Sequence, residues 1–245
     1  MRLLTDPRWP WQPQLLFAAS IPRGPLTPQV KGKIRRLDLD GAIRAALTAS
    51  STSRIRLSCS KLNDSNRASI VIDTGRFSPG AERVPFEIRS QVHVHELPDA
   101  PSGASWIALC HDLVRAVRGV HAVIPVTHSR YAMNDELYLS TTTVNGRLQH
   151  PDAMEIQRIN KHRTHLGTKY LWPPRWGNYL GPDAVAAAGG RDRIAAVVKP
   201  AVLAEVGPLL YVQLSAGFED ALAPATEVKR QELGTLLAPV MIPST

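Results

Sequence analysis

The chain is most informative between residues 169 and 182, which read KYLWPPRWGNYLGP. This stretch is dense in aromatic residues, glycines and prolines, and the apolar run LLYVQL follows it at 209–214. Aromatic rings bring large apolar area, and Pro173-Pro174 holds the approach extended, so we expect the block to pack a helix onto a sheet. Contact with a partner is the alternative, because Trp, Tyr and Arg also make interface hot spots. The block carries no nucleophile, carboxylate pair or metal cage, which favours a binding scaffold over an active site.

The segments around this block show the periodicities of short helices and strands. Between residues 102 and 118, apolar residues recur at steps of three or four, which predicts a helix that lies across a sheet. We expect further helices at about 38–49, 151–165, 183–188, 192–198 and 224–237, and strands at 14–20, 54–60, 68–73, 85–96, 121–127, 137–144, 202–206 and 209–215. Because helices and strands do not alternate strictly, the sequence predicts an α+β fold, with helices packed on one face of mixed, largely antiparallel sheets.

The composition predicts a chain that folds alone. Its 245 residues are 44% apolar, and no internal repeat is visible, so we expect a single domain over residues 1–245. Cys59 and Cys110 lie in runs typical of packed elements, which favours reduced thiols over a disulfide. No apolar run reaches the length of a signal-peptide core or a membrane span. We therefore expect a cytoplasmic location and no membrane partner.

The whole net charge of +8 lies in the N-terminal part. Residues 1–90 hold 15 of the 29 Lys and Arg but 7 of the 21 Asp and Glu, whereas the charges balance over 91–245. A basic surface of this kind contacts nucleic acid, an anionic membrane or an acidic protein, and the alternative is a solvated face without a ligand. Nucleic acid is the weaker expectation, because base-stacking aromatics are not interleaved with the cations. The candidate partner-binding residues are Lys31, Lys33, Arg35, Arg36, Arg54, Arg56 and Arg175.

Two histidine pairs have the spacing of metal ligands. His93 and His95 have strand spacing and share one face, but zinc needs a third ligand and usually a fourth, which the sequence does not supply nearby. His162 and His165 have helical spacing, but the neighbouring Lys161 and Arg163 would repel a cation. We therefore expect no metal and no other cofactor.

The sequence also holds nucleophile, base and acid types side by side at Cys110, His111 and Asp112. Consecutive helical side chains point in different directions and cannot form a relay, so we expect Cys110 in the core and no catalytic residues. The Gly189-Gly190 pair lacks the pattern of either nucleotide fingerprint, and we interpret it as a break between two helices.

The run from Trp176 to Pro182, the double glycine, and the stretch from Val206 to Gln213 together resemble the type VI secretion immunity protein family. In that family a tryptophan precedes a leucine-glycine pair, and a double glycine and then a glycine with an apolar strand follow. The resemblance covers residues 165–240. The motif residues are scaffold residues: Trp176, Tyr179, Gly181, Gly189, Gly190 and Tyr211.

The resemblance implies a bacterial self-protection protein that binds a cognate effector toxin and blocks it by stoichiometric occlusion. It supplies no catalytic residues. Because we expect this chain in the cytoplasm, the implied toxin also acts there, as a nuclease does. Two other hypotheses stay open: a nucleic-acid-binding accessory protein that uses residues 1–90, and a metal enzyme that uses His93 and His95. A homodimer through open sheet edges is a further partner to consider.

Overall fold

The structure is a computed structural model of the full sequence. It describes residues 97, 99, 102–126 and 169–243, together with the strands at 15–20, 30–33, 52–58, 68–73, 87–92, 143–144 and 147–148. The chain divides into two compact units, Met1–Pro98 and Asp99–Thr245, and each unit is described by itself. The single domain stays a prediction. The helices expected at about 38–49 and 151–165 lie outside the described residues.

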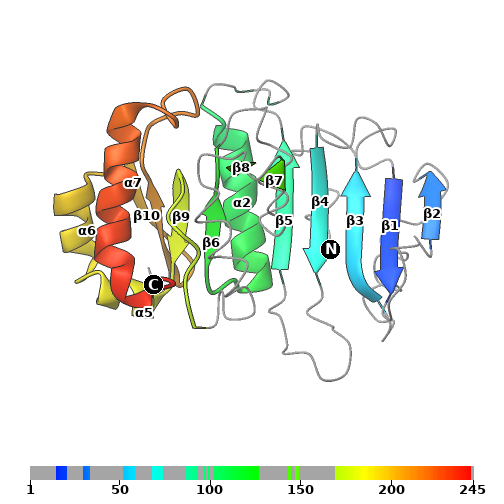
Figure 1. The fold of residues 1–245 in the computed structure, drawn as a ribbon, viewed down its shortest axis with the longest axis horizontal. Coiled ribbons are helices and arrows are strands. Elements are labelled where there is room, and N and C mark those ends of the chain that lie inside the picture. Colours follow the sequence, from blue (N-terminus) through cyan, green and yellow to red (C-terminus); the bar gives the residue numbers. More distant parts are fainter. Residues whose placement is uncertain are drawn as a thin grey trace. The chain divides into compact units, whose positions relative to one another are not determined.

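The first unit contains a five-stranded antiparallel sheet (Figure 1). Its strands are β1 (Leu15–Ser20), β2 (Val30–Lys33), β3 (Thr52–Ser58), β4 (Ala68–Asp73) and β5 (Glu87–Val92), in the order β2-β1-β3-β4-β5. Four of them confirm predicted strands. The sequence reasoning missed β2, because its residues VKGK combine glycine and lysine, which are depleted in strands, and only pairing with β1 identifies it.

The second unit contains a four-stranded antiparallel sheet in the order β10-β11-β9-β6. Its strands are β6 (Ala122–Ile124), β9 (Gly177–Leu180), β10 (Val202–Val206) and β11 (Leu209–Gln213), and a separate hairpin pairs β7 (Thr143–Val144) with β8 (Arg147–Leu148). The sequence reasoning missed β9, because this strand is only four residues long and lies between prolines. Pairing with β11 on one side and β6 on the other fixes it in the sheet.

Within its described residues, the second unit has four α-helices: α2 (Ala104–Val117), α5 (Pro182–Ala187), α6 (Arg191–Val198) and α7 (Pro224–Leu237), the last followed by the 3-10 turn η7 (Ala238–Val240). Proline in the first turn starts α5 and α7, where its missing N–H costs no hydrogen bond. Arg118, at a φ of 51°, ends α2, and the Gly119 N–H returns to the Val114 carbonyl. All four helices lie close to their predicted positions.

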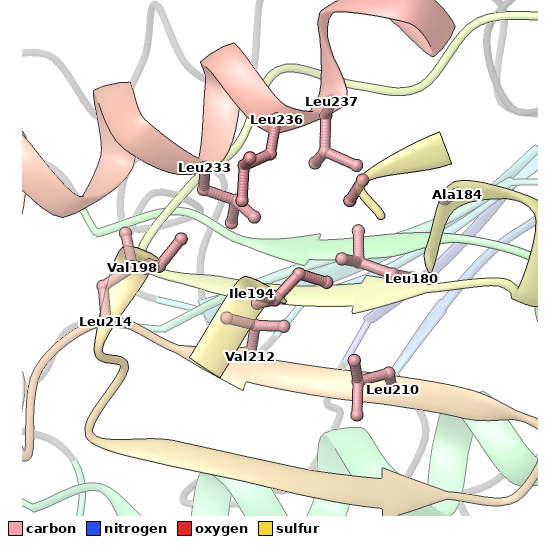
Figure 2. Close-up of a cluster of buried hydrophobic side chains, with 11 residues drawn as sticks. Leu180, Ala184, Ile194, Val198, Leu210, Val212, Leu214, Leu233, Leu236 and Leu237 are labelled. Atoms are coloured by element: carbon pink, nitrogen blue, oxygen red, sulfur yellow. The ribbon is translucent and has the colours of Figure 1, made fainter. Parts of the chain in front are cut away.

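The main hydrophobic core of the second unit lies between the sheet and the three C-terminal helices. Figure 2 shows Leu233, Leu236 and Leu237 of α7 on the side of the cluster opposite Leu210 and Val212 of β11. Their buried neighbours in the same core cluster are Leu180, Ala184, Ala188, Ile194, Val198 and Leu214. These helices therefore cover one face of the sheet.

The opposite face of the same sheet carries the alternate residues of the strands. Tyr179 on β9 and Tyr211 on β11 pair with each other, and both rings contact His111 of α2 edge to face. The α+β class with an antiparallel sheet is thus confirmed. Helices α5, α6 and α7 pack on one face of the sheet, and His111 of α2 contacts the tyrosines of the other face.

The Gly189-Gly190 pair makes the break between α5 and α6 that the sequence predicts. Gly189 has a φ of 88° and Gly190 a φ of 95°, and Gly190 combines this with a ψ of 167°. Residues other than glycine rarely adopt this backbone conformation. A Cβ at Gly190 would meet no atom within 4 Å, so backbone conformation alone explains the glycine there.

We expect Gly190→Ala to lower the free energy of unfolding by about 1 to 3 kcal/mol, through backbone strain without a steric clash. The matched control is Gly234→Ala in α7, where a Cβ would only touch Pro174 Cγ at 4.0 Å. That control should raise stability by up to about 1 kcal/mol, because alanine favours a helix interior over glycine. Urea denaturation followed by circular dichroism compares the two variants, and an equal effect of both would contradict this role.

Candidate functional site

The pairing register of the first unit gathers basic residues on one face of its sheet. Phe17 on β1 pairs with Lys31 on β2 and with Arg56 on β3. Arg56 pairs in turn with Val71 on β4, and Val71 pairs with Arg89 on β5. Residues directly opposite in an antiparallel sheet share a face, so this row places three cations on one face.

The neighbouring rows on the same face add two more cations. Positions two apart on a strand share a face, which adds Lys33 from β2 and Arg54 from β3. We call the face that carries Lys31, Lys33, Arg54, Arg56 and Arg89 the basic face; the row of Arg54 also places Asp73 and Glu87 on it. The rows between them form the other face, where the paired positions carry no charged residue and include Leu16, Ala18, Val30, Gly32, Ile55, Leu57, Ala68, Ile70, Ile72, Ile88, Ser90 and Val92.

Four of the seven predicted partner-binding residues therefore come together in the basic face, and sequence reasoning missed a fifth member, Arg89. The alternation in Glu87–Val92, which reads EIRSQV, was the available signal for Arg89. Arg35 and Arg36 lie outside the described residues. Arg175 belongs to the other unit.

Arg175 is only 8% exposed and acts within the second unit. Its backbone N–H donates to Asn178 Oδ1, and Asn178 Nδ2 donates back to the Arg175 carbonyl, each across 2.7 Å. The hydrogen bonds that Arg230 donates hold the pKa of Glu227 below its ordinary value, and the charge of Arg175 adds to the effect. Burial thus withdraws most of Arg175 from a partner's reach.

The aromatic residues of the predicted motif lie in the core of the second unit, whereas Gly189 is exposed and Gly181 and Gly190 are partly buried. Trp176 is buried, donates from Nε1 to Ser215 Oγ across 2.7 Å and packs against Phe218 at 4.7 Å between ring centroids. Tyr179 and Tyr211 are also buried. A Cβ at Gly181, which precedes α5, would lie 3.1 Å from the Val120 carbonyl oxygen. The motif therefore specifies the packing of β9, β11 and the first turn of α5.

Cys110, His111 and Asp112 are consecutive residues of α2, but His111 and Asp112 form hydrogen bonds with different residues. His111 Nδ1 is hydrogen-bonded to the Tyr179 hydroxyl across 2.8 Å, and Arg115 donates to Asp112 across 3.2 Å. Burial raises the pKa of the Cys110 thiol to about 12 and raises the pKa of both tyrosines above their ordinary value. Burial therefore disfavours the thiolate and the phenolate forms further than in water.

His121 joins three segments of the second unit. The Tyr179 carbonyl can only accept, so His121 Nδ1 donates to it across 2.8 Å, and Nε2 accepts from the Trp172 N–H across 3.2 Å. Burial lowers the pKa of His121 to about 4. The neutral ring thus ties the start of β6 to β9 and to the segment that leads into it. No local pattern in the sequence indicates this role.

The remaining candidate ligands are not placed by the structure. His93, His95, His162 and His165 lie outside the described residues. Within the described ranges, no three His, Cys, Asp or Glu side chains gather as a metal site would require. The helices of those ranges are also too short or too polar to cross a bilayer.

We expect the contribution of His121 to stability to depend on pH. Because its pKa is lower in the folded chain than in the unfolded chain, the contribution is complete above pH 6.5 and is lost as pH falls towards 4. Relative to His121→Asn, which keeps a donor for the Tyr179 carbonyl, the wild type should lose about 2 kcal/mol between about pH 7.5 and pH 4.5. Urea denaturation across this range measures the difference, and a constant gap between the two proteins would rule the effect out.

Comparison with known proteins shows a likeness in fold. No protein-family model matches the chain, and no curated protein matches it. Among solved structures, the chain is similar to the Pseudomonas aeruginosa T6SS protein PA0821, with a TM-score of 0.53 and 14% sequence identity. The alignment covers 94% of this chain and 64% of that protein, so the chain spans less than two thirds of that protein's length. At this identity the likeness shows a shared fold.

Proposed function

We propose that this chain is an immunity protein of a type VI secretion system, which binds a cognate effector toxin and blocks its activity. The observation that carries the proposal is the fold shared with a T6SS protein over 94% of the chain. The motif of Trp176, Tyr179 and Gly181 resembles the type VI immunity family independently of that likeness. The fold likeness supports an association with type VI secretion, and the motif supports the immunity role within it.

In such a protein, the buried motif and the exposed surface have different roles. Trp176, Tyr179 and Tyr211 pack inside the second unit and make its architecture, so they mark the family without touching a toxin. Recognition then depends on surface residues, which can differ between relatives that share this scaffold. We propose stoichiometric occlusion, in which the surface covers the toxin's active site, with no catalysis by this chain.

The chemical state of the described nucleophiles supports a role without catalysis. Burial raises the pKa of the Cys110 thiol and of the Tyr179 and Tyr211 phenols, which makes their nucleophilic anions harder to form. We further propose that the complex forms in the cytoplasm and that the toxin acts there, as a nuclease does.

The basic face favours one other candidate function, nucleic-acid binding through the first unit. Five cations on one sheet face are an electrostatic footprint that phosphate groups match. Affinity for nucleic acid of this origin falls steeply between about 50 and about 200 mM salt, because bound counterions are released. Binding that does not respond to salt would exclude this candidate.

The proposed function predicts a tight complex with the product of the neighbouring toxin gene. Full-length chain should co-purify in equal amounts with a catalytically inactive form of that toxin at micromolar concentration. Expression of the chain should also restore growth to cells that produce the active toxin. A toxin from an unrelated gene pair is the control, and failure of both complex formation and growth rescue would contradict the proposal.

A further inference from the structure

We propose that the basic face of the first unit is a docking surface for a protein that presents a cluster of carboxylates. This inference rests on the proposed function in that it takes the toxin to be that protein. The juxtaposition that carries it is the row Lys31–Phe17–Arg56–Val71–Arg89 across all five strands, with Lys33 and Arg54 in the adjoining rows.

The spacing of the cations makes their charges act together. Adjacent strands lie about 4.8 Å apart, and positions two apart on a strand are separated by about 7 Å. Lys31 and Arg56 therefore stand two strand spacings apart, and Arg54 is one step of the pleat from Arg56. These separations are comparable with the screening length of about 8 Å at physiological salt, so the potentials of neighbouring cations add. Asp73 lies directly opposite Arg54, so a partner's negative charge is needed mainly beside Lys31, Lys33 and Arg56.

The two faces of the sheet differ sharply in chemistry. The face between the basic rows is aliphatic, without a charged residue, and suits the core of the unit. Covering the basic face with an apolar partner would leave cations without counter-charges, which is costly. The charge pattern therefore selects an anionic partner for one face of the sheet.

Other residues on the basic face favour a protein over nucleic acid. The row that begins with Ala19 and Arg54 continues with Asp73 and Glu87, which would repel a phosphate backbone but can pair with Lys or Arg of a protein. Leu15, Phe17 and Val71 add apolar positions between the cations. Arginines among apolar residues are typical of protein interfaces, and each guanidinium matches a carboxylate in two hydrogen bonds.

The test compares charge reversal on the basic face with an equal reversal elsewhere in the full-length chain. The first variant combines Lys31→Glu with Arg56→Glu, and the control combines Lys169→Glu with Arg193→Glu, at two exposed positions of the second unit. Calorimetric titration with the inactive toxin should show at least a tenfold weaker complex for the first variant and a change within about twofold for the control. If the first variant does not fold, Lys31→Gln with Arg56→Gln removes the charge with a smaller perturbation and should also weaken the complex.

Each outcome of these measurements either supports or overturns the docking surface. Equal affinity of wild type and folded basic-face variant for the toxin would overturn this inference and leave the immunity function standing. If the wild type does not bind the toxin, the proposed function fails, and the face is then tested with poly-L-glutamate and single-stranded DNA of equal charge. Tighter binding of the peptide, lost in the basic-face variant only, supports the docking surface. Tighter binding of the DNA, or of neither probe, overturns it.

Discussion

The pairing of β9 with both β6 and β11 is the interaction on which the second unit depends. It places Tyr179 opposite Tyr211 and Leu180 opposite Leu210, so that successive residues of one short strand enter two different packing layers. The tyrosines contact His111 of α2, and the leucines join the core under α5, α6 and α7. His121 adds a third tie to the same strand through the Tyr179 carbonyl. One four-residue strand thus sets the positions of all four helices.

Because the motif residues are needed for packing, the part of the sequence with the clearest motif is not the part that we expect to bind a toxin. Trp176, Tyr179 and Gly181 are fixed by packing and close approach, and their replacement damages the fold before it alters a surface. The basic residues of the first unit have the opposite character, because the register gathers them on one face of a sheet whose other face supplies the apolar residues. The second unit carries the buried aromatic residues Trp176, Tyr179 and Tyr211, and the first carries the basic face.

The sequence predicts those parts of the fold in which local signals agree. The helix at 224–237 begins at a proline, the helix at 104–117 has a clear apolar stripe, and the strand at 202–206 is rich in apolar residues. The strand β9 and the cover on both faces of its sheet depend on pairing partners distant in the sequence, so no local pattern predicts them. The same holds for the candidate site: Arg54 and Arg56 alternate visibly, but only the register unites them with Lys31 and Arg89. The combination of Trp, Tyr and Arg in the aromatic block, typical of interface hot spots, placed Arg175 among the partner-binding residues, although the structure buries it.

The most direct test of the division between a scaffold unit and a docking unit is hydrogen–deuterium exchange of the full-length chain, alone and with the inactive toxin. The account predicts that the toxin slows amide exchange in β1, β2 and β3 and leaves exchange in β9 and β11 unchanged, because those two strands are already buried inside the second unit. Slower exchange confined to residues 99–245, with β1 to β3 unaffected, would contradict it.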